Sequence, residues 1–369
     1  MRIGIAGAGL AGRLTAFLLS QRGHQVTVFE ASSSPSPARG TIRAAAWTAA
    51  GMLSPIAEME QGGPVVRDLG FRSLMLWQEI DDALSGALGQ PFDAHNHHSR
   101  HYADHHDELK ETHDSPLGLQ LNDSLIVCHA NDLGAAQRIL QHLDQDPSRF
   151  ASLTGPEVAP LAPGLKGTLH AWRLIGEGHL FPTQAMESLF RGAQGVDWRW
   201  STPIIRLGTN TIEIAEGQQA FDWVIDTRGV GASSDISVRG VRGELLVLFA
   251  PGFELHRPVR LVHPRWRVYI VPRPGRQIVI GATEIESEDR SPISVQSTME
   301  LLSSAFSIFP SLAEARILWT DVNLRPAMMD NLPFVETQPG LTRINGLFRH
   351  GWLLAPAVIE QALRDADLS

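Results

Sequence analysis

The chain has 369 residues, which is more than one compact core usually holds, so we expect two closely packed domains. It carries 40 acidic and 31 basic residues, and this negative balance argues against a general nucleic-acid-binding surface, because phosphates require a basic patch. Cys128 is the single cysteine, which excludes an internal disulfide and a cysteine-based metal cluster.

The N-terminal residues have the pattern of a dinucleotide-binding βαβ unit. The pattern predicts, in order, a short buried strand over residues 1–6, a glycine turn over 7–12, a helix over 13–23 and a second strand over 25–29. Strand, glycine turn and helix in this order are far more specific than a glycine-rich turn alone. We therefore expect a nucleotide site at the start of the chain.

Each residue type in this turn has a physical reason. Gly7 permits the tight turn, Gly9 lets the backbone approach a pyrophosphate, and Gly12 lets helix and strand pack closely. The helix N-terminus offers free N–H groups to the phosphates. Glu30, after the second strand, is placed to accept hydrogen bonds from a ribose. An acid at this position disfavours a 2′-phosphate, so FAD or NAD is favoured over NADP.

The same unit bears on the location of the protein. It starts so close to residue 1 that we expect no signal peptide before it. Residues 3–19 are fairly apolar, but glycines interrupt them and the stretch is short for a membrane span. Cys128 ends an apolar stretch and is expected to be a buried, inert thiol. We therefore expect a cytoplasmic protein without a membrane span.

Further along the chain, strands and helices alternate without an internal repeat. The expected elements of the first half are a loop at 32–37, helices at 65–84 and 132–143, a proline-containing connection at 156–165 and a helix at 183–192. Strands are expected at 203–207 and 222–226, followed by an antiparallel meander of 245–249, 267–271 and 277–280. A helix at 299–309 comes next, and a glycine loop at 346–351 leads into a helix ending near 363. The strands at 203–207 and 222–226 are expected to return the chain to the nucleotide domain, the second running into the glycine turn at Gly229.

Histidines are concentrated between His95 and His113. Such a cluster can bind a metal, but this one lacks a fixed two-ligand helix motif and is interleaved with other polar residues. We favour a polar surface loop or hairpin for this segment and predict no metal site.

Several later motifs occur in a characteristic order. They are AAGMLSP at 49–55, YIVPR at 269–273 with IGAT at 280–283, LRP at 324–326, and RHG at 349–351 followed by LAPA at 354–357. Together with the N-terminal unit, they resemble the FAD-dependent amino-acid oxidases of the D-amino-acid oxidase class, and most of all the glycine oxidases of thiamine biosynthesis. The resemblance spans nearly the whole chain and favours FAD over NAD.

The resemblance implies an α/β fold in which a Rossmann-like FAD-binding domain is joined to an α+β substrate domain built on a mainly antiparallel sheet. We expect the FAD-binding domain at residues 1–80, 150–235 and 325–369, and the substrate domain at 81–149 and 236–324. It also implies hydride transfer from the Cα–H of a small amino acid or secondary amine to the flavin. Oxygen or another acceptor would then reoxidise the flavin. The oligomeric state is left open, with a homo-oligomer as one option.

The resemblance also implies roles for particular residues. Arg325 would pair with the substrate carboxylate, Tyr269 would contact the same carboxylate, and Arg349 would lie near flavin and substrate. A planar guanidinium can hold a carboxylate by two parallel charge-assisted hydrogen bonds. The expected cofactor-binding residues are Gly7, Gly9, Gly12, Glu30, Ala50, Gly51, Met52, Ile204, Gly229, His350, Gly351, Trp352 and Leu353.

The chain departs from the family pattern at several of these motifs. The changed positions are Leu347 and His350 in the flavin loop, the enlarged Trp352, Ala45, Ala46 and Trp47 in place of serines and threonines, and Asn323 in place of a glycine. Arg267, two residues before Tyr269, is a further candidate for the pocket. These changes favour a substrate other than glycine, one with an extra negative group being an option.

Two other functions stay open from the sequence. One is a flavoprotein that modifies an amine carried by tRNA or by a protein, although the acidic net charge counts against tRNA. The other is a non-catalytic FAD-binding protein in which the changed flavin loop has abolished turnover.

Overall fold

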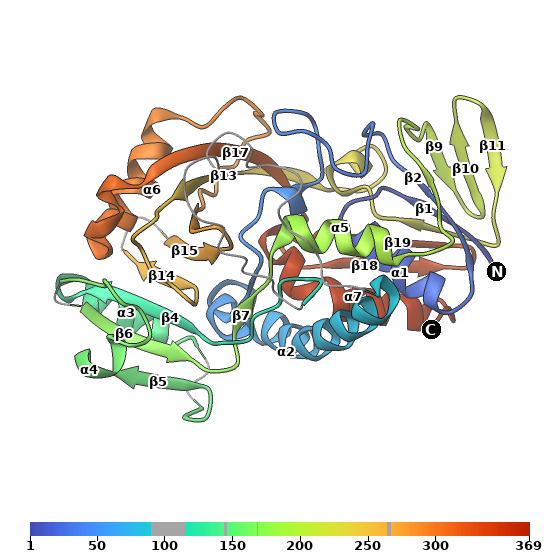
Figure 1. Ribbon diagram of the computed structural model, residues 1–369. Coiled ribbons are helices and arrows are strands. Elements are labelled where there is room, and N and C mark those ends of the chain that lie inside the picture. Colours follow the sequence, from blue (N-terminus) through green and yellow to red (C-terminus); the bar gives the residue numbers. More distant parts are fainter. Residues whose placement is uncertain (90–114, 144–145, 168, 264–266) are drawn as a thin grey trace.

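The computed structural model describes the whole chain except residues 90–114, 144–145, 168 and 264–266 (Figure 1). The histidine-rich segment from His95 to His113 lies outside the described residues. Among the helices that are described, none combines the length and apolar character needed to cross a bilayer. Within the same residues, no group of three or more His, Cys, Asp or Glu side chains could hold a metal ion.

A six-stranded sheet holds the N-terminal unit. Its strand order is β18-β19-β12-β1-β2-β8, and all neighbours are parallel except β18 and β19. The strands are β1 (Arg2–Ala6), β2 (Gln25–Phe29), β8 (Asp197–Arg199), β12 (Trp223–Asp226), β18 (Phe334–Gln338) and β19 (Leu341–Asn345).

Both faces of this sheet are covered, which is why its central strands are apolar throughout. On one face Ile3 and Ile5 pack against helices α1 (Leu10–Gln21), α2 (Pro55–Leu88), α5 (Pro182–Gly192) and α7 (Gly351–Asp365). On the other face lies a small antiparallel sheet of β9 (Arg206–Gly208), β10 (Thr211–Ile214) and β11 (Gly217–Ala220). A Cβ at Gly4 would lie 2.8 Å from the Phe221 ring, so this close approach requires glycine.

The predicted βαβ unit is confirmed. The strands over 1–6 and 25–29 are present, and α1 begins at Leu10, earlier than the predicted start at residue 13. The predictions of the strand at 222–226, of the helix at 183–192 and of the helix that follows the glycine loop at 346–351 are also confirmed, as β12, α5 and α7.

The predicted strand at 203–207 was wrong in extent. Strand β9 begins only at Arg206, where its ladder with β10 begins opposite Glu213, and residues 203–205 lie outside it. Of the two strands expected to return to the nucleotide domain, β12 alone pairs with β1. Strand β9 instead belongs to the small covering sheet.

Helix α2 contains the helix predicted over 65–84, but it starts at Pro55. Its regular path is interrupted at Gly63, whose φ of 63° is left-handed and which precedes Pro64. The turns before this break carry Ala57, Glu58 and Gln61 along the wall of the pocket described below.

An eight-stranded sheet forms the second layer, in the order β17-β13-β16-β15-β14-β4-β6-β5. Its ladders are antiparallel except that between β4 and β14. The strands are β4 (Ser124–His129), β5 (Phe150–Leu153), β6 (Leu169–Leu174), β13 (Arg239–Phe249), β14 (Val259–Val262), β15 (Arg267–Arg273), β16 (Gln277–Gly281) and β17 (Arg316–Ala327).

The three predicted strands are present and their ladders are antiparallel. The predicted meander was wrong in strand order, because β16 lies between β13 and β15. Helix α6 (Val295–Ile308) matches the predicted helix at 299–309 and covers one face, where Phe309 is fully buried. Helix α3 (Leu133–Leu140) lies on the opposite face, packed on β4 and β6.

The remaining elements are short. They are the paired strands β3 (Met52–Leu53) and β7 (Gly178–His179), helix α4 (Gly155–Val158), which overlaps the start of the predicted connection, and the 3-10 helices η1 (Ala45–Trp47), η4 (Ala130–Asp132), η5 (Gly229–Ala232), η6 (Pro310–Glu314) and η7 (Phe348–His350).

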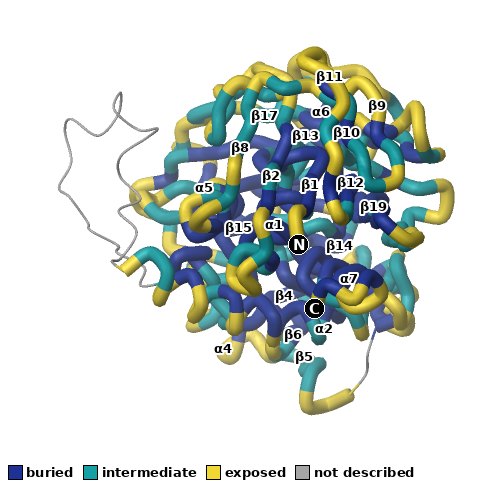
Figure 2. The backbone as a smooth tube through the Cα atoms, turned by 90° about the vertical axis from the view of Figure 1, so that its right-hand side faces the viewer, coloured by how far each residue is buried: buried dark blue, intermediate teal, exposed yellow. Residues whose placement is uncertain are grey.

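Strands β5 and β6 pair with β4, so sheet membership places residues 150–174 with the eight-stranded sheet. The domain boundaries, which put these residues in the FAD-binding domain, stay a prediction. Both chain ends lie close together at the end of the molecule that carries the six-stranded sheet (Figures 1 and 2). Figure 2 also shows buried residues along β1, β2 and β13 and exposed residues around β11.

Candidate active site

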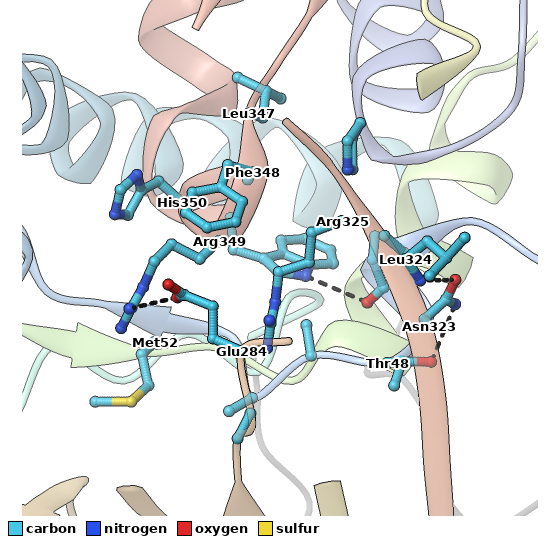
Figure 3. Close-up of a pocket in the computed structure, with 18 of the residues that line it drawn as sticks. Thr48, Met52, Glu284, Asn323, Leu324, Arg325, Leu347, Phe348, Arg349 and His350 are labelled. Atoms are coloured by element: carbon cyan, nitrogen blue, oxygen red, sulfur yellow. Dashed lines mark hydrogen bonds and ion pairs between the residues drawn. The ribbon is translucent and has the colours of Figure 1, made fainter. Parts of the chain in front are cut away.

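A cavity of about 1280 Å³ is lined by the glycine turn after β1 and by strands β14, β15 and β17 of the eight-stranded sheet. It is larger than the roughly 300–1,000 Å³ usual for small-molecule pockets, so it has room for a dinucleotide and a small substrate together. Figure 3 shows part of its wall, where side chains from β17 and from the loop before α7 meet.

The glycine turn leaves the N-terminus of α1 open to this cavity. Gly7 has a φ of 96°, and Gly9 forms the N-cap of α1 without a side-chain capping bond. A Cβ on Gly9 would lie 3.3 Å from the Cβ of Ala44, so the cavity is narrow there. Gly12 does not line the cavity, and a Cβ on it would lie 1.9 Å from the carbonyl oxygen of Gly7. Gly12 therefore serves the close helix packing expected of it.

Glu30 lies at the edge of the cavity and holds the turn. Its carboxylate accepts hydrogen bonds from the backbone N–H of Ala8 at 2.7 Å and of Ser32 at 2.8 Å. A carboxylate has about four acceptor positions, so two bonds leave capacity for ribose hydroxyls.

Arg13 lies buried behind the turn, and its only sequence signal was a charge on an apolar helix face. Its guanidinium donates to the carbonyls of Ala8 at 2.9 Å, Met186 at 2.7 Å and Pro35 at 2.5 Å. The rings of Trp47, Phe190 and Trp200 surround it, with centroids 5.3 to 5.6 Å from Cζ. Burial lowers the pKa of Arg13 to about 10.

These features together fit the adenosine and pyrophosphate portion of FAD. An uncapped helix N-terminus supplies N–H groups and a favourable dipole to phosphates, and the glycines leave space for close approach. The acid that follows β2 suits a ribose diol. The cavity continues from this end to the residues predicted to bind substrate.

Arg325 and Tyr269 reach the cavity from β17 and β15. The Nη1 of Arg325 donates to the carbonyl of Thr283 at 2.9 Å, and among the described residues no carboxylate forms an ion pair with it. Burial raises the pKa of Tyr269, which keeps its hydroxyl protonated as a donor. At this point the wall therefore presents a guanidinium with unused donors beside a phenol.

Arg349 is placed differently, because it already has two carboxylate partners. Its Nε lies 3.1 Å from Glu58, and its Nη1 lies 3.0 Å from Glu284 (Figure 3). The same Nη1 donates to Gln61 at 2.7 Å. These contacts hold the side chain along the cavity wall, between η7 and α2.

Glu58 is the centre of this charged cluster. Besides Arg349 it accepts from Arg260 at 2.6 Å and from the Nε2 of His350 at 2.9 Å. Burial by itself raises the pKa of Glu58, but Arg349, Arg260 and the His350 hydrogen bond hold it well below its usual value. Glu58, Arg260 and Glu284 were missed by sequence reasoning. The available signal was an acid in the apolar stretch after the motif at 49–55.

Several residues that depart from the family pattern form hydrogen bonds or ion pairs within the protein. The Nδ2 of Asn323 donates to the carbonyls of Arg43 at 3.3 Å and Ala44 at 3.2 Å, and to Thr48 Oγ1 at 3.2 Å (Figure 3). Asn323 thereby fastens the segment that lacks the usual hydroxyls to β17. The Nε1 of Trp352 donates to the carbonyl of Ala46 at 3.3 Å. Arg267 lines the cavity but is paired with Glu60 at 2.7 Å.

Most of the predicted site residues are brought together in this cavity. Those that line it are Gly7, Gly9, Glu30, Ala50, Gly51, Met52, Gly229, Tyr269, Arg325, Arg349, His350, Gly351, Trp352 and Leu353. Ile204 is outside the lining and packs with the apolar cluster beneath the small covering sheet. The individual roles of these residues toward cofactor and substrate stay predictions.

Comparison with known proteins agrees with this geometry. A model of the FAD dependent oxidoreductase family matches residues 2–361. The chain is 35% identical to a putative thiamine biosynthesis oxidoreductase ThiO of Rhizobium etli, across 99% of this chain and 96% of that protein. It is 26% identical to a glycine oxidase of Bacillus licheniformis, across 96% and 90% of the two chains. The crystal structure of glycine oxidase from Geobacillus kaustophilus shares the fold, with a TM-score of 0.80 at 23% identity over 99% and 95% of the chains.

Proposed function

The chain belongs to the family of FAD-dependent oxidoreductases, and we propose that it transfers a hydride from the Cα–H of a small amino acid or secondary amine to FAD. The oxidised product is an imine, which water hydrolyses to an oxo acid and ammonia or an amine. Glycine and its N-substituted derivatives are the first candidates to test, because a similar protein is a glycine oxidase. The changed motifs favour a substrate other than glycine, so other small amino acids are tested beside them.

The observation that carries this proposal is the state of Arg325. It is a cavity-lining guanidinium that no carboxylate of the described chain neutralises, beside a protonated phenol at Tyr269. Arg349 and Arg267, in contrast, are paired with carboxylates of the protein itself. A substrate carboxylate is the partner that completes Arg325.

In this proposal, the residues of the chain bind the substrate and orient its Cα–H bond. Arg325 binds the carboxylate by two parallel hydrogen bonds, and Tyr269 donates a third, which fixes the direction of the Cα–H bond. FAD, when bound, supplies the acceptor for the hydride. The walls of Met52, Leu347 and Phe348 exclude water around the reacting carbon. Such positioning supplies much of the rate, since hydride transfer requires short distance and alignment.

The test is anaerobic mixing of the purified, FAD-loaded protein with glycine, sarcosine and D-amino acids while the flavin absorption is followed. We expect at least one of them to bleach the flavin. The Arg325→Ala variant should lose about 100-fold or more in the rate of flavin reduction per unit substrate concentration, because the carboxylate loses its cation. FAD content should be unchanged. If no amine bleaches the wild-type flavin, the substrate class is wrong, and an unaffected Arg325→Ala variant would remove this residue from the mechanism.

We further propose that oxygen or another acceptor reoxidises the flavin and that the protein works in the cytoplasm. Measuring hydrogen peroxide formed per substrate consumed separates the acceptors. A one-to-one ratio in air identifies oxygen, and turnover that requires an added dye identifies another acceptor.

A further inference from the structure

Two glycines of the eight-stranded sheet lie beneath the side chains that we propose bind the substrate carboxylate. Arg325 extends from β17 over Gly243 of the neighbouring strand β13, and Tyr269 extends from β15 over Gly281 of the neighbouring strand β16. Strands β13 and β16 are themselves adjacent. The guanidinium and the phenol therefore lean toward each other from opposite sides, each across one glycine.

Gly243 is in direct contact with the guanidinium. A Cβ built on Gly243 would lie 2.4 Å from Cζ and Nη2 of Arg325 and 2.7 Å from Nη1. Non-bonded carbon atoms normally approach to about 3.5–4.0 Å, so no side chain fits there while Arg325 keeps its place. The φ of Gly243 is not among the positive values, so space rather than backbone conformation requires the glycine.

Gly281 stands in the same relation to Tyr269. Its Cβ would lie 2.6 Å from the hydroxyl oxygen of Tyr269 and 2.8 Å from Cε2 and Cζ of the ring. Gly281 pairs directly with Tyr269 across the ladder of β15 and β16. Its φ is likewise not positive. At both positions, therefore, glycine is required because the side chain of Arg325 or Tyr269 lies directly against the backbone.

The floor beneath Arg325 is fixed by a second set of bonds. The carbonyl of Thr283 accepts a hydrogen bond from Arg325. Thr283 in turn donates two hydrogen bonds to Glu244, from its N–H to the backbone carbonyl at 3.2 Å and from its hydroxyl to the carboxylate at 3.0 Å. Glu244 follows Gly243 in β13, and its carboxylate is held by the buried Arg242 at 2.6 Å. A guanidinium displaced from Gly243 therefore leaves the Thr283 carbonyl rather than carrying it along.

We propose that Gly243 and Gly281 are positioning residues that form a trough in the sheet, and that this trough sets the height at which Arg325 and Tyr269 hold the substrate carboxylate. The inference rests on the proposed function. A methyl group at position 243 lifts the guanidinium by about 1 Å, and a misplacement of that size can cost roughly 100-fold in rate. Neither glycine lines the cavity itself, so the trough acts through Arg325 and Tyr269, which do, and therefore on the substrate rather than on FAD.

The experiment compares Gly243→Ala with Gly240→Ala in the FAD-loaded protein. Gly240 lies in the same strand, but its added methyl would meet Leu324 at 3.0 Å instead of the guanidinium. The probe is acetate, a carboxylate that cannot be oxidised, titrated while the flavin absorption is followed. We expect Gly243→Ala to weaken acetate binding about 10-fold or more and to raise KM for the amine substrate similarly, with FAD affinity unchanged. Gly240→Ala should match the wild type in both constants.

A double-mutant cycle on the melting temperature separates positioning from simple damage to the sheet. If the methyl acts by colliding with Arg325, the loss of melting temperature in Gly243→Ala should largely disappear when Arg325→Ala removes the collision. Equal losses in both backgrounds, or wild-type acetate binding by Gly243→Ala, would overturn the proposal. The failure of the proposed function looks different. In that case no amine bleaches the wild-type flavin, while the acetate titrations and the cycle still report on the trough.

Discussion

The guanidinium groups of three arginines, Arg13, Arg325 and Arg349, have different hydrogen-bond and ion-pair partners. Arg13 is surrounded by carbonyls and aromatic rings, and Arg349 is paired with two carboxylates. Arg325 has one carbonyl and spare donors that face the cavity. The partners, rather than the residue type, therefore separate a structural arginine from one available to a ligand.

For Arg13 we predict a role in cofactor affinity. Its three acceptor carbonyls lie on separate segments, and a lysine ammonium cannot reach all of them. Arg13→Lys should lower the free energy of unfolding by about 2–3 kcal/mol and weaken FAD binding, because Ala8 in the glycine turn loses its support. Denaturant unfolding and titration of the apoprotein with FAD measure the two effects. Arg22→Lys, just beyond the end of the same helix, is the control, and equal behaviour of both variants would contradict the prediction.

The sequence identified Arg325 and Tyr269 because short motifs around them resemble a family pattern. It did not identify Arg13 or Glu58, whose roles depend on partners far along the chain. Arg13 needs the carbonyl of Met186, and Glu58 needs Arg260 and Arg349. No local pattern records such long-range pairs, so a single sequence could not have revealed them.

At the level of elements, the N-terminus of α2 depends on one buried acid. Glu177 accepts from the N–H groups of Ile56 at 2.8 Å and Ala57 at 2.9 Å, and from the hydroxyl of Ser124 at 2.6 Å. Burial raises the pKa of Glu177 to about 7, in spite of the nearby Arg260. The acid thereby links the start of α2 to β4 and fixes the turns that carry Glu58.

This pKa predicts a pH-dependent stability. The unfolded chain loses the Glu177 proton near pH 4.5, whereas the folded protein keeps it up to about pH 7. The stabilisation is therefore complete below pH 4.5 and is lost as the pH rises through 7. Glutamine does not ionise. Between pH 5 and pH 8 the wild type should therefore lose about 2–3 kcal/mol of its free energy of unfolding relative to the Glu177→Gln variant. Denaturant unfolding at both pH values measures this change, and an unchanged difference would show that Glu177 ionises normally.

Local patterns identified most elements but not all of their neighbours. The β1 to β2 unit and α7 follow from periodicity and glycine turns. Strand β9 was misplaced, because an apolar stretch at 203–207 does not show where its ladder with β10 begins. Likewise, hydrophobic runs predicted β13, β15 and β16 but not that β16 lies between the other two. The order of strands depends on long-range pairing that periodicity does not record.

For the whole molecule, the important feature is that one cavity joins both large sheets. Its lining includes Gly9, Glu58, Gly229, Arg325 and Trp352, which lie far apart in the sequence. A ligand that fills this cavity contacts residues of both large sheets at once. Its binding energy therefore contributes to the stability of the fold as a whole.

Removal of FAD should accordingly lower the melting temperature of the entire protein in a single transition. Adding FAD back at about 100 times its Kd should restore about 2.7 kcal/mol. NADP at the same concentration should not, because Glu30 disfavours a 2′-phosphate. Differential scanning calorimetry of apoprotein, reconstituted protein and the NADP mixture measures these differences. Identical melting of apoprotein and reconstituted protein would show that the cofactor does not bridge the two sheets.

Strand β1 lies between β2 and β12, and β12 in turn pairs with β19 at residues 341–345. During synthesis on the ribosome, the first strand therefore leaves the exit tunnel long before its second neighbour exists. At about 5–20 residues per second, roughly ten seconds or more pass before β12 follows, and longer before β19. Until then, the edge of β1 that later pairs with β12 stays unpaired, and a chain terminated before β12 would have the glycine turn without the strand that pairs beside it.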